Sequence, residues 1–127
     1  MTFCAGGDLC DYLSKKGPLS EAQARIFLSE LTLAIEYLHS LDIIYRDLKP
    51  ENVVLDGEGH VLLTDFGLSK QGVDDNSLTK TFCGSPAYLA PEMIIQKGHG
   101  KSVDWYNLGA FLYEMVCGVP PFYADTR

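Results

Sequence analysis

The chain has 127 residues, of which 46% are hydrophobic and 21% charged, a balance that excludes both a disordered polypeptide and a membrane protein. With 17 acidic and 10 basic residues, its net charge of −7 argues against binding to a nucleic-acid backbone and favours a basic partner. The 4 cysteines form no Cys-x-x-Cys pair and no apolar run could span a bilayer, so we expect an intracellular protein, cytoplasmic or nuclear, without membrane insertion.

Two helices are predicted in the first third of the chain. Asp8 follows two glycines and is a typical N-cap, and Gly17-Pro18 ends the short helix that it begins. Ser20 and Gln23 form a capping box that opens a longer helix, which extends to about His39. Its apolar face comprises Phe27, Leu31, Ala34, Ile35 and Leu38.

The rest of the chain combines short β-type runs with one further helix. Residues 43–45, 53–55 and 61–63 are β-type runs, and Asp56-Gly57-Glu58-Gly59 is a hairpin turn signal between the last two. Residues 69–85 are polar and aperiodic, which predicts a long surface loop. A final helix is predicted from about residue 103 to 117, where Gly118 ends it. The expected fold is α+β, mainly α.

Residues 45–52 read Tyr-Arg-Asp-Leu-Lys-Pro-Glu-Asn, which matches the catalytic loop of protein kinases. Phosphoryl transfer needs a carboxylate that accepts the proton of the attacking hydroxyl, and an amide oxygen that helps hold Mg²⁺ against the phosphates. Asp47 and Asn52 supply these two groups. A polar turn between two strands would explain an Asp and an Asn, but not the whole octet.

Two further motifs follow in the order that kinases use. Asp65-Phe66-Gly67 lies directly after the last β-type run, where the kinase pattern places its second metal-binding carboxylate. Ala90-Pro91-Glu92 closes a segment of 28 residues, counted from Asp65 through Glu92. Three ordered motifs are far more specific than any one of them alone.

With these motifs, the chain resembles the AGC group of eukaryotic Ser/Thr protein kinases over nearly its whole length. Tyr45 stands where most kinases have His, and Thr81-Phe82-Cys83-Gly84 and Val103-Asp104-Trp105 are also typical of the group. The resemblance implies a fragment of the kinase C-terminal lobe with short β-hairpins and no N-terminal lobe. Residues 1–127 would form a partial kinase domain, from the hinge through the long helix after Ala-Pro-Glu.

The resemblance implies a role for each residue of the catalytic loop. Asp47 would be the catalytic base, Lys49 would neutralise charge on the transferred phosphoryl group, and Asn52 and Asp65 would hold Mg²⁺. Asp8 would lie near the ribose of ATP, so ATP and Mg²⁺ are the implied nucleotide and metal. The alternatives are a solvated surface lysine for Lys49 and a simple helix cap for Asp8.

A regulatory phosphorylation site is also implied. An unpaired guanidinium is costly next to the catalytic Asp, so Arg46 needs an anionic partner. The resemblance makes this partner phosphorylated Thr81, with Lys70 as a second contact, and implies an upstream activating kinase. Thr79 is a competing phosphorylation site, and an ordinary loop threonine is the alternative.

Four residues match positions that contact the protein substrate in basic-directed members of the group. They are Asp8, Glu51, Ser85 and Glu114, and the three carboxylates among them would face substrate arginines. Separately, Asp104 would brace the catalytic loop from the last helix. Ser85 stands where the group usually has Thr and keeps the hydroxyl, whereas Ala87 replaces a usual Glu. The implied partner is a protein with basic residues near its phosphoacceptor, although Glu114 could be a plain exposed helix residue.

The sequence of residues 1–127 includes no glycine-rich phosphate loop and no strand lysine for the α- and β-phosphates. We therefore expect the isolated chain to be inactive. Two function classes remain open, a partial sequence of an active Ser/Thr kinase and a truncated kinase-like binding or scaffold module. Asp47, Lys49, Asn52 and Asp65 are all intact, which favours the enzyme because binding alone gives no chemical reason for all four.

Overall fold

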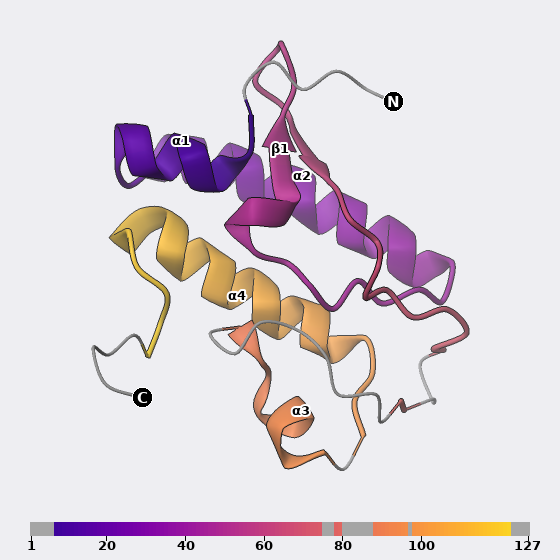
Figure 1. Cartoon of the computed structure of the whole chain (residues 1–127). Coiled ribbons are helices and arrows are strands. Elements are labelled where there is room, and N and C mark those ends of the chain that lie inside the picture. The colour runs from indigo at the N-terminus through magenta and orange to yellow at the C-terminus, as the bar shows by residue number, and fades with distance from the viewer. Residues whose placement is uncertain (1–6, 75–77, 80–87, 97, 123–127) are drawn as a thin grey trace.

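The computed structural model describes residues 7–74, 78–79, 88–96 and 98–122. The elements run in the order α1 (Leu9–Lys16), α2 (Glu21–Ser40), the 3₁₀ turn η1 (Pro50–Asn52), β1 (Val53–Leu55), β2 (Val61–Leu63), α3 (Pro91–Ile95) and α4 (Ser102–Cys117). Figure 1 shows α2 and α4 packed against each other in the middle of the molecule, with the β-hairpin at one end and α3 at the other. The described part is thus rich in helix and has one small antiparallel sheet.

Both early helices begin at the caps that the sequence predicts. The carboxylate of Asp8 accepts a hydrogen bond of 2.8 Å from the amide of Asp11, and the hydroxyl of Ser20 accepts one of 3.2 Å from the amide of Gln23. Gly17 ends α1 with a φ of 77°, a left-handed conformation that suits glycine. These local signals fix where α1 and α2 lie along the chain.

The β1–β2 hairpin is joined to α2 by one glutamate. The strands pair antiparallel, with Val53 opposite Leu63 and Leu55 opposite Val61. Glu30 of α2 accepts hydrogen bonds from the amide of Val61 (3.1 Å) and, through its other oxygen, interacts with the His60 ring (3.2 Å). The hairpin therefore has a fixed position against the longest helix.

One hydrophobic core lies between α1, α2, the hairpin and α4. Helices α2 and α4 bring their apolar faces together because each repeats apolar residues at helical spacing. The fully buried core residues are Leu9, Ile35, Tyr45, Leu48, Val53, Phe111 and Met115. Two residues from the catalytic-loop octet, Tyr45 and Leu48, belong to this core, so the octet is anchored by hydrophobic packing.

Two details differ from the sequence-based expectation. Residues 43–45 are not a strand, because Ile44 makes a single bridge to Lys70 and the flanking Asp42 and Arg46 have left-handed φ values of 56° and 69°. The described residues contain one hairpin where the sequence suggested several. Helix α3 was not anticipated, since five residues are too few for a periodic pattern.

No helix in the described part of the chain combines the length and the apolar character needed to cross a bilayer. The assignment of the fold to one lobe of a kinase stays a prediction.

Packing in α4 can be tested with two aromatic residues two positions apart. Phe111 is fully buried, so Phe111→Ala is expected to lower the free energy of unfolding by about 3–5 kcal/mol through lost burial and a residual cavity. Tyr113 is 46% exposed, and Tyr113→Ala should cost about 1 kcal/mol or less. Urea denaturation measures both. Equal losses would contradict the placement of this helix.

Candidate active site

Asp47 and Asn52 lie together in a buried hydrogen-bond network. The side-chain amide of Asn52 donates to the Asp47 backbone carbonyl at 2.9 Å and to Asp47 Oδ2 at 2.8 Å. Only 7% of Asp47 and 6% of Asn52 is exposed. Lys49 Nζ lies 3.7 Å from the other carboxylate oxygen of Asp47. The three residues predicted to carry catalysis are therefore neighbours in space.

Asp65 is brought to the same place by the hairpin. Beyond the end of β1–β2, Thr64 donates to the carbonyl of Asn52 from its amide at 2.9 Å and from its hydroxyl at 3.1 Å. Asp65 follows directly and is exposed, and its carboxylate accepts from the Gly67 amide at 3.1 Å. A Cβ at Gly67 would come 3.0 Å from that carboxylate oxygen, so glycine permits this close approach.

The oxygen donors present fit a magnesium ion. Because both hydrogen bonds of the Asn52 amide nitrogen go to Asp47, the amide oxygen is left as an acceptor, and the Asn52 backbone carbonyl accepts from Thr64, the residue before Asp65. Mg²⁺ in phosphate sites takes one or two protein oxygen ligands, with phosphates and water completing its shell. Within the described ranges, no group of three His, Cys, Asp or Glu residues could hold a metal ion, so a site here would need phosphate oxygens as well.

Asp104, at the start of α4, holds the catalytic loop in place. Its carboxylate is fully buried and accepts from the amides of Tyr45 and Arg46, each at 2.8 Å. His39 Nε2 lies 2.8 Å from the same carboxylate. The prediction that Asp104 braces this loop is confirmed.

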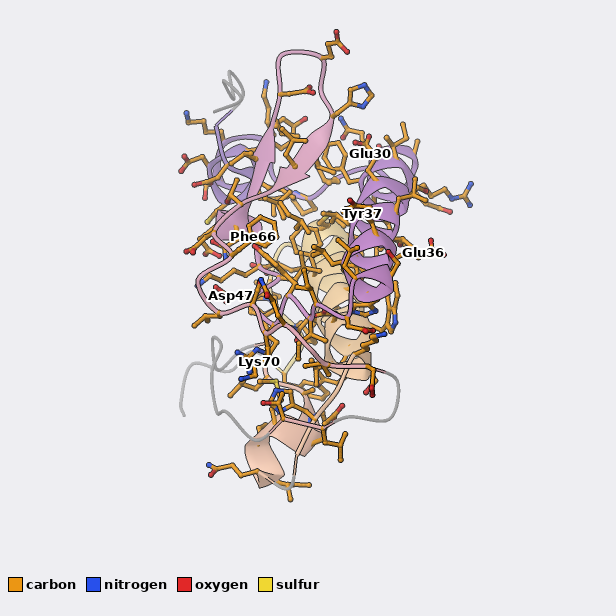
Figure 2. The ribbon with its side chains drawn as sticks, turned by 90° about the vertical axis from the view of Figure 1, so that its right-hand side faces the viewer. Glu30, Glu36, Tyr37, Asp47, Phe66 and Lys70 are labelled. Carbon is orange, nitrogen blue, oxygen red and sulfur yellow. The ribbon has the colours of Figure 1, made fainter. Side chains whose placement is uncertain are left out.

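The ring of Tyr45 links the loop to the Asp65-Phe66-Gly67 motif. Its hydroxyl donates to the carbonyl of Thr64, and its ring meets that of Phe66 edge-on, with centroids 5.4 Å apart. Burial, and then the negative charge of Asp47, raise the pKa of the Tyr45 phenol, which stays protonated. Figure 2 shows Phe66, Asp47 and Lys70 on one side of the view, with Glu30, Tyr37 and Glu36 of α2 on the other.

Comparison with known proteins shows to which family this chain belongs. A model described as "Protein kinase domain" matches residues 1–127. The chain belongs to the protein kinase family. As a family, these enzymes use ATP and Mg²⁺.

The relatives of this kinase chain narrow the group. It is 52% identical to human Serine/threonine-protein kinase Sgk2 over 98% of the chain and 34% of that protein. It is 50% identical to rat RAC-beta serine/threonine-protein kinase over 97% of the chain and 26% of that protein. Identity to yeast Serine/threonine-protein kinase YPK2/YKR2 is 51%, over 99% of the chain and 19% of that protein. The resemblance to AGC-group Ser/Thr kinases is confirmed, and the chain spans between about a fifth and a third of the length of these relatives.

Arg46 of the kinase loop is buried with one nitrogen unpaired. Only 5% of the residue is exposed, and its Nε donates to the carbonyl of Leu68 at 2.7 Å. Its Nη1 is buried and has no hydrogen-bond partner among the described residues. The backbone of Lys70 pairs with that of Ile44, two residues before Arg46. Thr81, the predicted phosphorylation site, lies outside the described residues.

The three carboxylates predicted to contact substrate lie around one cysteine. Burial, and then the negative charges of Glu51 and Asp8, raise the pKa of the Cys10 thiol to about 11. Burial, and then the charge of Glu51, raise the pKa of Glu114 to about 7, and Glu114 Oε2 is buried without a partner in the described structure. Glu114 and Cys10 line a pocket of about 240 Å³.

Two of the residues predicted to contact substrate need a separate statement. Asp8 also caps α1, which is the alternative role given for it above, and Ser85 lies outside the described residues.

Three residues near the kinase site were missed by the sequence reasoning. His39, His99 and Cys10 become significant only through residues distant in sequence, namely Asp104, Arg46 and Glu51. For His39 a signal existed, since it falls four residues after Ile35 on the buried face of α2. For the other two, no spacing or motif in the sequence points to them.

Removing the charge of Asp104 tests its role as the brace of the kinase loop. Asp104→Asn is expected to lower the free energy of unfolding by about 3 kcal/mol, because its carboxamide cannot accept both loop amides and places an N–H against one of them. Hydrogen exchange of the Tyr45 and Arg46 amides should accelerate as well.

The matched control is Asp42→Asn, which removes the ion pair of 3.0 Å between the half-exposed Asp42 side chain and Lys101. It should cost less than about 1 kcal/mol and leave the loop amides protected. Unchanged exchange in Asp104→Asn would show that the loop is held by other contacts.

Proposed function

We propose that residues 1–127 are the catalytic-loop portion of a Ser/Thr protein kinase that transfers the γ-phosphate of ATP to protein substrates. The observation that carries this proposal is the buried contact between Asp47 and Asn52, with Asp65 held beside them through Thr64. A carboxylate, an amide oxygen and a second carboxylate at one place are the groups that phosphoryl transfer requires. The kinase-lobe assignment and the domain bounds of 1–127 are part of this proposal.

Each residue then has one task. The oxygen of the substrate hydroxyl forms a bond to the γ-phosphorus, the bond from that phosphorus to the bridging oxygen of ADP breaks, and the hydroxyl proton passes to Asp47. Lys49, 3.7 Å from Asp47, is positioned to offset negative charge on the phosphoryl group. Asn52 and Asp65 would hold Mg²⁺, which supplies positive charge at the phosphates.

Substrate preference for basic residues is supported by the acidic region around Cys10. Burial, and then the negative charge of Glu51, raise the pKa of Glu114. A guanidinium placed between them would relieve this repulsion and satisfy the unpaired oxygen of Glu114. Asp8 adds negative charge at the nearby start of α1. We therefore propose a protein substrate with an arginine near its phosphoacceptor.

A chimeric enzyme tests the catalytic role. The 123-residue segment of the rat RAC-beta kinase that matches this chain would be replaced by the chain itself. The chimera is expected to phosphorylate a basic peptide with Mg²⁺-ATP, and Asp47→Asn should reduce kcat by at least about a hundredfold because the proton acceptor is lost. The isolated chain should show negligible activity.

Asp42→Asn in the same chimera is the matched control, since the Asp42 side chain pairs with Lys101 and not with a residue of the catalytic loop. It should leave kcat unchanged. A chimera that folds and binds peptide but transfers no phosphate would favour the alternative, a kinase-like binding or scaffold module.

The raised pKa of Glu114 predicts a pH-dependent preference for arginine. Between about pH 6 and pH 8, Glu114 passes from neutral to ionised, and only the carboxylate attracts a guanidinium strongly. The ratio of kcat/KM for an arginine peptide to that for the same peptide with leucine should rise about tenfold over this range. Taking the ratio cancels every pH effect that is common to the two peptides.

Glu114→Gln should flatten this profile, whereas Glu36→Gln on the exposed face of α2 should not alter it. A flat profile in the unmodified chimera would remove Glu114 from the substrate site.

A further inference from the structure

Helix α2 is apolar on two opposite faces. One face is buried in the core against α4 and the hairpin. On the other face, four large apolar side chains are between 52% and 65% exposed, namely Ile26, Leu33, Tyr37 and Leu41. A surface helix normally combines one apolar face with one polar face, so a second apolar face indicates a partner.

The exposed face has the spacing of a coiled-coil seam. Steps of four or three residues lead along it through Ala22, Ile26, Ser29, Leu33, Tyr37 and Ser40, all exposed and none charged. We call these six residues the α2 seam. The hydroxyl of Ser29 donates to the carbonyl of Arg25 at 2.7 Å, and the hydroxyl of Ser40 donates to the carbonyl of Tyr37 at 2.5 Å. Because both serine protons are used within the helix, the seam suits the apolar packing of another helix.

Charges of both signs lie along one edge of the seam. Arg25 pairs with Glu21 at 2.6 Å, yet its side chain is 77% exposed. Glu36 is also exposed and follows Arg25 by eleven residues, which is about three helical turns, so both project from the same edge. A purely basic partner would be repelled by Arg25 and a purely acidic one by Glu36. The partner that fits has both charges in the opposite order.

We propose that the α2 seam binds the α2 seam of a second copy of this chain, with the two helices antiparallel. A two-fold axis near residue 31 places Leu33 over Ser29 of the partner subunit, so that a large side chain meets a small one. The same axis places Ile26 beside Tyr37 of the partner subunit. Symmetric dimers are the commonest oligomers, and their interfaces are self-complementary in this way.

The charges select the antiparallel direction. A two-fold axis between antiparallel helices keeps each edge of the seam against the same edge of the partner. Arg25 therefore lies next to Glu36 of the partner subunit, and this pair occurs twice in the dimer. In a parallel dimer, each of the two charges would meet its own copy, and like charges repel.

The dimer face lies apart from the candidate active site. Figure 2 shows Tyr37 and Glu36 on the opposite side of the view from Asp47 and Phe66. Dimerisation therefore leaves the catalytic loop accessible. This inference goes beyond the proposed function and does not depend on it.

Sedimentation equilibrium of the full chain, from about 1 to 100 μM, measures the dissociation constant of the dimer. A concentration-dependent equilibrium between monomer and dimer is expected. Leu33→Asp should raise the dissociation constant at least about tenfold, because the dimer would bury a carboxylate in its apolar seam. Leu33 is 65% exposed in the monomer, so the variant keeps its fold, which circular dichroism verifies.

Charge reversal tests the direction of the helices. Arg25→Glu and Glu36→Arg should each weaken the dimer severalfold, because each brings like charges together twice. An equimolar mixture of these two variants should form a heterodimer as stable as the wild-type dimer, since every pair is again of opposite sign. Lys15→Glu at the exposed end of α1 makes the same charge change as Arg25→Glu and should leave the dissociation constant unchanged.

A chain that stays monomeric over this concentration range overturns the proposal, and a dimer that Leu33→Asp leaves intact does so too, because it uses another face. A dimer that both charge reversals leave intact overturns the antiparallel direction. A monomeric chain that binds a basic amphipathic peptide through Leu33 would replace the second copy by a different partner.

Discussion

The geometry of the catalytic loop depends on one buried carboxylate. Asp104 is fully enclosed, yet three donors from two other segments satisfy it, the amides of Tyr45 and Arg46 and the ring of His39. An isolated buried charge would be strongly unfavourable, so these bonds are required for the fold and not merely compatible with it. One of these bonds is made by the amide of Arg46, which has a left-handed φ of 69° directly before Asp47.

The hairpin contributes to the site through its backbone. Strands β1 and β2 contain no polar side chain of the site, but their register places Asn52 at the end of one strand and Thr64 beyond the end of the other. The carbonyl of Asn52 then accepts both bonds from Thr64, and Asp65 follows. Catalytic residues are therefore carried by segments that the strands position, a common division between scaffold and site.

Local features of this chain could be predicted and contacts between distant segments could not. The caps at Asp8 and Ser20 and the turn at residues 56–59 act over three or four residues, so the sequence contains all the information they need. The Asp47–Asn52 pair was likewise recognisable from its spacing. Residues 43–45 failed as a strand because pairing depends on a partner that only tertiary structure supplies, and His99 gave no signal for the same reason.

The pairing of Thr79 with His99 has a structural consequence. It joins the segment after Lys70 to the turn that leads into α4, and the first turn of α4 carries Asp104. Only five residues separate His99 from Asp104, the carboxylate that holds the catalytic loop. That carboxylate binds the amides of Tyr45 and Arg46, directly before Asp47, so the chain joins this pairing to the catalytic loop without any contact to Asp47 itself.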